Sequence, residues 1–305
     1  MSHALRSLFA SAIDYAGLFP PAGLSMSEAA RQHSQYVKSP DAWALGRFVL
    51  PAKRLAELES AATGIWNASH RWRISALVNS SAELSDCLAF NERQREVAVI
   101  DMIEVKATSA EELRAALIGV PATMMTYVEI PLAAAATLVP LLAAAQGATA
   151  QVCAKVRTGG LTAEGFPACQ ELAEFMEVCA KARLPFKATA GLHHPLRRVA
   201  AFTYEPGSAS GTMHGFMNVF VAAAFLWHGW SAERVVPILE ETATDGFHFD
   251  ANGVAWRGQR LDNAALVGCR SDFIRSFGSC SFTEPITELT ELGFLNSADV
   301  KGKLS

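Results

Sequence analysis

Two lysines stand at matching places on two successive strand-like segments. Lys155 lies in CAKVRTGG (153–160) and Lys187 lies in FKATAGLHHP (186–195). Burial penalises the ammonium form of lysine, so a buried lysine loses its proton easily, and a neutral amine near a second cation is the usual nucleophile towards a carbonyl group. A turn that contains glycine follows each lysine. Together the two lysines indicate carbonyl chemistry on a barrel scaffold.

Other charged residues stand late in the same series of segments. If these segments are parallel strands of a barrel, their carboxyl ends meet at one mouth, where barrel enzymes place their sites. Side chains alternate along a strand, so Glu104 shares a face with Lys106, and Lys155 shares one with Arg157. The predicted catalytic residues are Lys155, Lys187, Glu104, Glu129 and His193, the last as a neutral acid or base. The competing interpretation is a structural ion-pair network inside the barrel.

The predicted substrate-binding residues surround this mouth. Glycines after a strand let backbone N–H groups approach an anion, and the last strand-like segment carries Ser279 and Ser281 where barrels commonly bind phosphate. The full predicted set is Arg47, Lys106, Arg157, Gly159, Gly160, His194, Ser279 and Ser281. For the glycines and serines, a turn of small residues required only by packing is the alternative interpretation.

Strand-like and helix-like segments alternate along the first two thirds of the chain. Apolar segments rich in β-branched residues recur roughly every 25 to 30 residues, at 45–51, 73–79, 97–107, 124–131, 150–160 and 185–191. Helix-like stretches lie between them, at 52–62, 82–95, 109–117, 132–145 and 164–182. This alternation predicts repeated βα units and a parallel sheet. Six units exceed a minimal open sheet, so the expected fold is α/β, a single TIM-like (β/α) barrel with an elaborated C-terminal third.

The expected organisation is one α/β-barrel domain over residues 1–305. Residues 1–43 form an N-terminal cap segment in this interpretation, and residues 44–191 form the regular βα units. Residues 192–296 form irregular final units, and residues 297–305 form a polar tail.

The two ends of the barrel sequence depart from the regular pattern. Segment 9–23 resembles neither strand nor helix, and two interpretations stay open: it folds across the barrel mouth, or it plugs one barrel end. Towards the C-terminus, 246–250 is the best candidate for a seventh strand and 276–282 for the closing strand. Asn252–Gly253 is a hairpin signal. Helices are expected at 214–228, 231–242, near 261–275 and at 284–292.

Composition excludes several classes of function. Hydrophobic residues make up 50% and charged residues 18% of the chain, and the net charge is −4, so a nucleic-acid or anionic-membrane partner has no support. The most apolar run, 216–227, is far shorter than the roughly 20 residues of a membrane span. The six cysteines form no CxxC pair and no signal-peptide pattern is present, so a reduced cytoplasmic protein is expected. Motifs for nicotinamide, ATP and serine-hydrolase chemistry are missing.

One family resemblance follows from the lysine segments. K-V-R-T-G-G (155–160) with F-K-A-T-A-G (186–191) is similar to the paired lysine strands of the deoxyribose-phosphate aldolase family, class I Schiff-base aldolases on a TIM barrel. The resemblance implies that Lys155 forms the imine, that Lys187 is the cation easing its deprotonation, and that Asp101 relays protons. We favour Glu104 for the last role, because on a regular strand an inward Asp101 would turn Glu104 outward. The chain also looks like a bacterial protein family that carries no assigned activity.

Three functional hypotheses follow. The leading one is a lyase or aldolase acting on a small oxo-acid or sugar-like carbonyl compound, phosphorylated or not, without a cofactor. The second is a metal-dependent lyase, isomerase or hydrolase, suggested by the adjacent histidines of GLHHPLR (191–197). Its donor set would be His193, His194 and His214 with Glu104 or Glu129. The third is a barrel that binds a ligand without catalysis. In each case the expected partner is a small molecule, and the apolar content permits a homo-oligomer.

Overall fold

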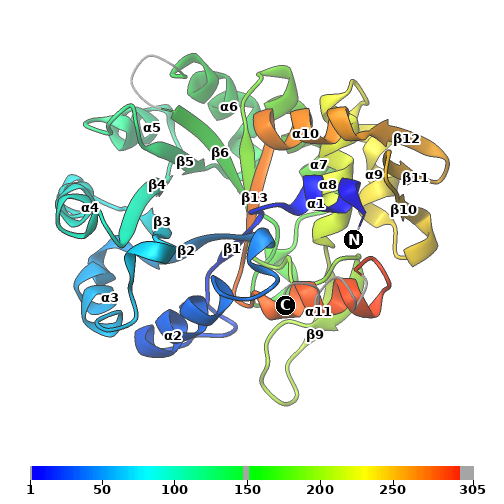
Figure 1. Cartoon of the computed structure of the whole chain (residues 1–305). Coiled ribbons are helices and arrows are strands. Elements are labelled where there is room, and N and C mark those ends of the chain that lie inside the picture. Colours follow the sequence, from blue (N-terminus) through cyan, green and yellow to red (C-terminus); the bar gives the residue numbers. More distant parts are fainter. Residues whose placement is uncertain (1, 147–150, 296–305) are drawn as a thin grey trace.

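The computed structural model of the chain is a closed barrel of parallel strands surrounded by helices (Figure 1). The structure describes residues 2–146 and 151–295. The strand order around the barrel is β1-β13-β7-β6-β5-β4-β3-β2, and each strand runs parallel to both of its neighbours. The predicted TIM-like α/β barrel is therefore confirmed.

The barrel strands and the helices have the following bounds. The strands are β1 (Ile13–Tyr15), β2 (Leu45–Pro51), β3 (Trp72–Leu77), β4 (Ala98–Lys106), β5 (Met125–Glu129), β6 (Gln151–Arg157), β7 (Phe186–Thr189) and β13 (Ile274–Ser279). The helices are α1 (His3–Phe9), α2 (Met26–Tyr36), α3 (Leu55–Ala61), α4 (Ser81–Gln94), α5 (Ala110–Leu117), α6 (Ala135–Ala144), α7 (Cys169–Lys181), α8 (Phe216–Trp227), α9 (Ala232–Glu240), α10 (Asn263–Asp272) and α11 (Thr283–Glu291). Strands β2 to β7 coincide with the six predicted segments.

The segment 9–23 was expected to be neither strand nor helix, and this expectation is wrong for its first half. Ile13–Tyr15 forms β1, which pairs with β13 on one side and β2 on the other and so closes the barrel. Three residues are too few for period-2 alternation to be visible in a sequence. Pro20 and Pro21, from the second half, line the cavity at the mouth.

The last third contains two small sheets outside the barrel. Strands β8 (Arg198–Ala201) and β9 (Ser210–Met213) form a hairpin, which lies beside α11 in Figure 1. Strands β10 (Phe247–Phe249), β11 (Gly253–Trp256) and β12 (Gln259–Asp262) form an antiparallel sheet. The predicted hairpin at Asn252–Gly253 is confirmed, but 246–250 is not a barrel strand, because β10 pairs with β11 in this separate antiparallel sheet. The polar tail expected at 297–305 lies outside the described residues.

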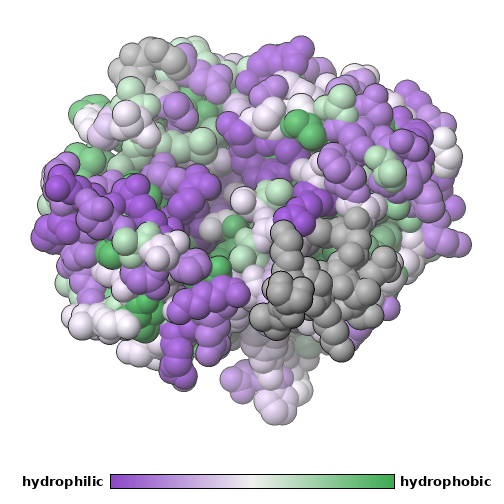
Figure 2. Space-filling view, in the orientation of Figure 1, coloured by the Kyte–Doolittle hydropathy of each residue, from purple (hydrophilic) through white to green (hydrophobic). Residues whose placement is uncertain are grey.

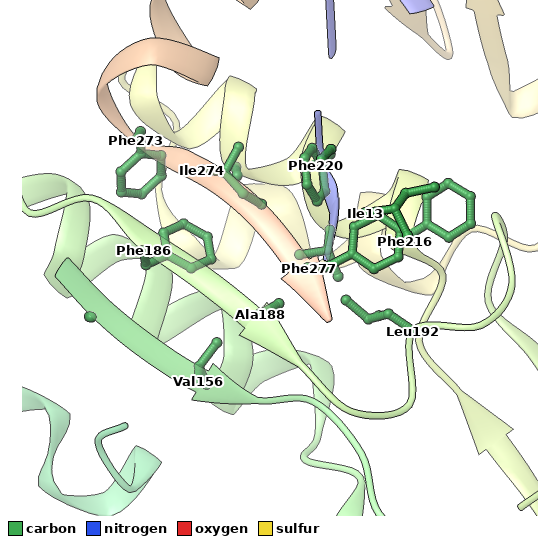
Figure 3. Close-up of a cluster of buried hydrophobic side chains, with 14 of the residues drawn as sticks. Ile13, Val156, Phe186, Ala188, Leu192, Phe216, Phe220, Phe273, Ile274 and Phe277 are labelled. Carbon is green, nitrogen blue, oxygen red and sulfur yellow. The ribbon is translucent and has the colours of Figure 1, made fainter. Parts of the chain in front are cut away.

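Helix α8 anchors the closing strand of the barrel. The Phe216 ring stacks on Phe277 of β13 with centroids 4.9 Å apart, and Phe220 packs edge-on against the same ring. Figure 3 shows these rings together with Phe186 of β7 and Ile13 of β1. This cluster therefore packs α8 against the closing strand of the barrel.

Several properties of the outer shell bear on the sequence expectations. Within the described ranges, every helix is too short or too polar to cross a membrane. The six cysteines are buried and carry free thiols, as expected. On the face shown in Figure 2, hydrophilic side chains cover α4 and the β10–β12 sheet, while hydrophobic side chains occur in small groups.

Candidate active site

Five ionisable side chains inside the barrel form an unbroken series of contacts of alternating sign, here called the ion chain. Its members in order are Asp14, Lys187, Glu104, Lys155 and Glu129. Lys187 Nζ lies 2.6 Å from Asp14 Oδ2 and 2.8 Å from Glu104 Oε1. Lys155 Nζ lies 2.7 Å from Glu104 Oε2 and 2.8 Å from Glu129 Oε2. All five residues are buried, and they come from five different strands.

Strand register explains why these residues meet. Lys155 on β6 has Lys187 on β7 and Glu129 on β5 as its Cα partners. Paired residues of parallel strands point to the same side of the sheet, so all three side chains enter the barrel at one level. Glu104 on β4 is paired with Tyr127, two residues before Glu129, and its side chain reaches both amines.

Glu104 is the carboxylate that the two lysines share. Ser75 Oγ also donates a hydrogen bond of 2.7 Å to Glu104 Oε1. Burial alone would raise the pKa of Glu104, but the charges of Lys155 and Lys187 outweigh it and hold the pKa well below its ordinary value. The glutamate therefore stays ionised in the barrel interior.

Lys187 is held as a cation by the carboxylates on either side of it. Burial lowers the pKa of Lys187, yet Asp14 and Glu104 more than offset this, so the net shift is upward. Asp14 Oδ2 accepts a further bond of 2.7 Å from Ser276 Oγ, and Asp14 Oδ1 accepts one of 2.8 Å from the Arg47 backbone N–H. Asp14 was not among the site residues predicted from the sequence. The feature that could have indicated it is an acidic residue inside the apolar run Ile-Asp-Tyr.

A cavity of about 370 Å³ opens at the mouth above the ion chain. Its polar floor consists of Glu104, Lys155 and Glu129, while Lys187 lies behind them. The rim carries two cations, Lys106 and Arg157, and the Lys106 side chain is 68% exposed. The opposite wall is apolar and comprises Ala16, Phe19, Pro20, Pro21, Val49 and Leu77.

Most of the predicted site residues meet at this cavity, but a minority lie elsewhere. The predicted residues that line it are Glu104, Lys106, Glu129, Lys155, Arg157, Gly160 and His193. The predicted substrate-binding residues that do not line it are Arg47, Gly159, His194, Ser279 and Ser281.

Arg47 lies too early in its strand to reach the mouth. It is the third residue of β2, and its Nε lies 2.6 Å from Asp101 Oδ1. Asp101 also contacts Arg73, with Arg73 Nη2 2.7 Å from Asp101 Oδ2. Burial raises the pKa of Asp101, but the two guanidinium groups reverse the shift and lower it. Asp101 is thus engaged with arginines, and Glu104 is the β4 carboxylate that contacts Lys155.

The alternation argument that opposed Asp101 to Glu104 does not hold in the structure. Ile100 pairs with Ile74, but Met102 pairs with Ser75, so Asp101 is an extra residue at a β-bulge. A bulge breaks the strict alternation of faces along the strand. The choice of Glu104 agrees with the contacts, although the reason given for it was incomplete.

Gly159, Ser279 and Ser281 do not line the cavity, and their contacts are with neighbouring parts of the fold. A Cβ atom on Gly159 would lie 2.6 Å from Gly191 Cα and 2.7 Å from Phe166 Cε1, so glycine permits a close approach of two loops. Ser281 Oγ accepts a bond of 3.1 Å from the Glu284 backbone N–H at the start of α11. Ser279 is buried in the β1–β13 pairing.

His193 lines the cavity and belongs to a second polar group beside the ion chain. Its Nδ1 lies 3.3 Å from Glu284 Oε2 and 3.9 Å from Cys280 Sγ. Tyr204 Oη donates a 3.0 Å bond to the same Glu284 oxygen. Burial lowers the pKa of His193, but hydrogen bonding to Cys280 and Glu284 raises it to about 9. His193 is therefore a cation at neutral pH, not the neutral acid or base expected from the sequence.

The metal donor set predicted from the histidines is not brought together. His214 Nε2 donates to the Pro167 carbonyl oxygen at 2.8 Å, and burial lowers the pKa of His214 to about 4. His194 Nδ1 instead lies 2.7 Å from Glu288 Oε1. In the part of the chain that the structure describes, the group that brings three donor atoms within 4.8 Å of one another is His194, Glu284 and Glu288.

Comparisons with known proteins found no match to a family model, a curated protein or a solved structure. The fold is one that is commonly found in enzymes, and the cavity lies at the carboxyl ends of the strands, where (β/α)-barrel enzymes have their active sites. Function is accordingly argued from the geometry of the mouth.

Proposed function

We propose that the protein is a lyase of the aldolase type that forms an imine between Lys155 and a small carbonyl substrate. The observation that carries the proposal is the position of the Lys155 amine. It borders the mouth cavity and lies 2.7 Å from Glu104 and 2.8 Å from Glu129. A nucleophile and two proton acceptors are thus available at one point of the cavity.

In the proposed reaction, imine formation begins when Lys155 gives its proton to Glu129. Glu104 is a poorer acceptor because protonation would weaken its contacts with two ammonium groups. The neutral amine attacks the carbonyl carbon, and the amine proton moves to the oxygen to give a carbinolamine. The hydroxyl group then takes the proton held by Glu129 and leaves as water, which produces a protonated imine and restores the carboxylate.

The protonated imine supplies the driving force for carbon–carbon cleavage. Its positive nitrogen accepts the electron pair of the breaking bond, and Glu129 takes the proton of the hydroxyl group on the departing carbon. Lys187 supports these steps as a fixed cation. It keeps Glu104 ionised and places a second positive charge on the carboxylate that Lys155 contacts.

Borohydride trapping tests the proposal. Reduction of an imine yields a stable secondary amine, so incubation with small carbonyl compounds and borohydride is expected to leave an adduct on the Lys155 peptide in mass spectrometry. Lys155→Met is expected to abolish the adduct. Lys181→Met is the matched control, because Lys181 is an exposed lysine paired with Glu177 on α7. An adduct that persists in folded Lys155→Met, or no adduct with any carbonyl compound, would refute the imine.

A metal-dependent activity is the second candidate function, and the group His194, Glu284 and Glu288 favours it. Imidazole and carboxylate donors together suit zinc, manganese or iron. His193 contacts Glu284 and also lines the mouth cavity, so this group adjoins the same site. Elemental analysis of the purified protein separates the two functions: a stoichiometric metal that is lost in His194→Ala would support this candidate.

A further inference from the structure

The ionised groups of the mouth leave an excess of positive charge at the rim. The three carboxylates and two ammonium groups of the ion chain leave one negative charge, which the two rim cations Lys106 and Arg157 more than offset. Lys106 Nζ reaches Glu129 Oε1 only at 3.6 Å. Among the described residues, Arg157 takes part in no ion pair, although it lines the cavity. The mouth is therefore suited to one anionic group on the substrate.

The usual phosphate position of a barrel is already filled by an acid of this chain. Barrels commonly bind phosphate at the loops after the seventh and eighth strands and at a helix N-terminus. Here the corresponding helix is α11, and its first turn carries Glu284. Glu284 Oε2 lies 3.3 Å from His193 Nδ1 and accepts a 3.0 Å bond from Tyr204 Oη, so this carboxyl group is held at the start of the helix. A phosphate dianion would meet this carboxylate, and Ser281 is occupied by the Glu284 backbone N–H.

The wall opposite the lysines disfavours a polyol. Phe19, Pro20, Pro21, Val49 and Leu77 offer no side-chain hydrogen-bonding group there. Among the described residues that line the cavity, Thr189 alone carries a hydroxyl group. Burying sugar hydroxyls without hydrogen-bond partners is unfavourable, whereas an apolar substituent gains from the same contacts.

We infer that the substrate is a short oxo acid that carries an apolar substituent and no phosphate group, an inference that rests on the function proposed above. Arg157 and Lys106 bind the carboxylate, Lys155 takes the carbonyl carbon, and the apolar substituent packs on Phe19 to Pro21 and Leu77. The cavity of about 370 Å³ limits the substrate to a small molecule. Of the substrate classes considered, the inference selects oxo acids and excludes phosphorylated and sugar-like carbonyl compounds.

The first arm of the test does not depend on imine formation. Isothermal titration calorimetry with 4-methylpentanoate, which has no ketone, is expected to detect binding that inorganic phosphate does not displace. Arg157→Met is expected to weaken this binding about tenfold, the effect of losing one charge-assisted contact. Arg93→Met is the control, because Arg93 is an exposed arginine paired with Glu59. Phosphate binding that excludes the carboxylate, or equal binding by Arg157→Met, would overturn the inference.

The second arm uses borohydride trapping with 4-methyl-2-oxopentanoate, 4-methylpentan-2-one and glyceraldehyde 3-phosphate. The oxo acid is expected to give the fastest adduct, and Arg157→Met is expected to reduce its rate to that of the neutral ketone. A preference for the phosphorylated aldehyde would contradict the inference while leaving the imine function intact. Carboxylate binding in the first arm with no adduct from any compound would remove the imine function and leave the carboxylate site standing.

Discussion

At the scale of single residues, Glu104 is the carboxylate that compensates the charges of both buried lysines. It contacts Lys155 at one oxygen and Lys187 at the other. Removing one partner of a buried ion pair leaves an uncompensated charge, which costs far more than the pair itself contributes. Loss of the Glu104 charge would leave two ammonium groups in the interior with fewer acids than they have now.

Glu104→Gln is therefore expected to destabilise the protein by about 3–5 kcal/mol, the range for a broken buried pair. The free energy of unfolding can be measured by urea denaturation at neutral pH. Glu59→Gln provides the comparison, because Glu59 pairs with Arg93 at the surface, where such pairs contribute about 0–1 kcal/mol. Equal stability of Glu104→Gln and the unchanged protein would mean that the ion chain is not held as described.

Sequence patterns predicted much of the site, and the failures have physical reasons. Alternation says which face of a strand a side chain occupies, so Glu104, Glu129 and Lys155 could be recognised as one group. It does not say at which height in the barrel a residue lies, and Arg47 was placed at the mouth for that reason. Asp14 could not be recognised as a partner of Lys187, because the pair depends on a strand of three residues.

At the scale of elements, the loop after β7 brings His193 to the mouth through two unusual backbone positions. Ala190 has φ of 65° and Gly191 has φ of 74°, both in the left-handed region. Thr158 Oγ1 donates a 2.7 Å bond to the Ala190 carbonyl oxygen and holds this turn against β6. Strained backbone of this kind is found at functional sites where the surroundings enforce it.

Gly191→Ala is expected to lower both stability and the rate of adduct formation. A Cβ atom there would lie 2.6 Å from Phe166 Cε1 and 2.8 Å from Gly159 Cα, in addition to about 1 kcal/mol for the left-handed backbone. Gly207→Ala is the matched control, because Gly207 has φ of 78° but open space around it. Comparing the thermal unfolding of both variants isolates the steric contribution to stability. An equal loss of stability in the two variants would show that the close contact of Gly191 with Gly159 and Phe166 is unimportant.

Elements with enough residues to display a period were predicted well, and short ones were not. Strands β2 to β7 appeared as apolar segments rich in β-branched residues, and helices α3 to α7 overlap the predicted helix-like stretches between them. The strand assigned to 246–250 was wrong because its alternating residues pair with β11 in a separate antiparallel sheet. A strand pattern does not reveal which sheet the strand joins.

At the scale of the whole molecule, β1 decides whether the barrel is closed. It pairs with β13 from Ile13 to Tyr15 and with β2 on its other edge. A barrel without it would have two unpaired strand edges, which leaves backbone groups without partners and invites aggregation. The N-terminal segment is therefore part of the barrel wall, not a detachable cap.

Deletion of residues 2–16 is expected to abolish cooperative unfolding and to expose apolar surface that binds a hydrophobic dye. Circular dichroism melting and dye fluorescence measure these changes. Deletion of 205–207 is the control, because it shortens the β8–β9 hairpin outside the barrel. If the first variant still melts in one sharp transition, the segment acts as a plug and not as a strand.

The ion chain has a consequence for recombination between barrels. Two of its three acids, Asp14 and Glu104, come from the first four strands, whereas Glu129 and both amines come from the last four. A chimera that joins one half of this barrel to a half from another protein would separate both lysines from Asp14 and Glu104. Buried charges would then be left without partners where the two halves meet. Natural or engineered exchange of half-barrels would thus succeed here only if the incoming half carried the matching set of charges.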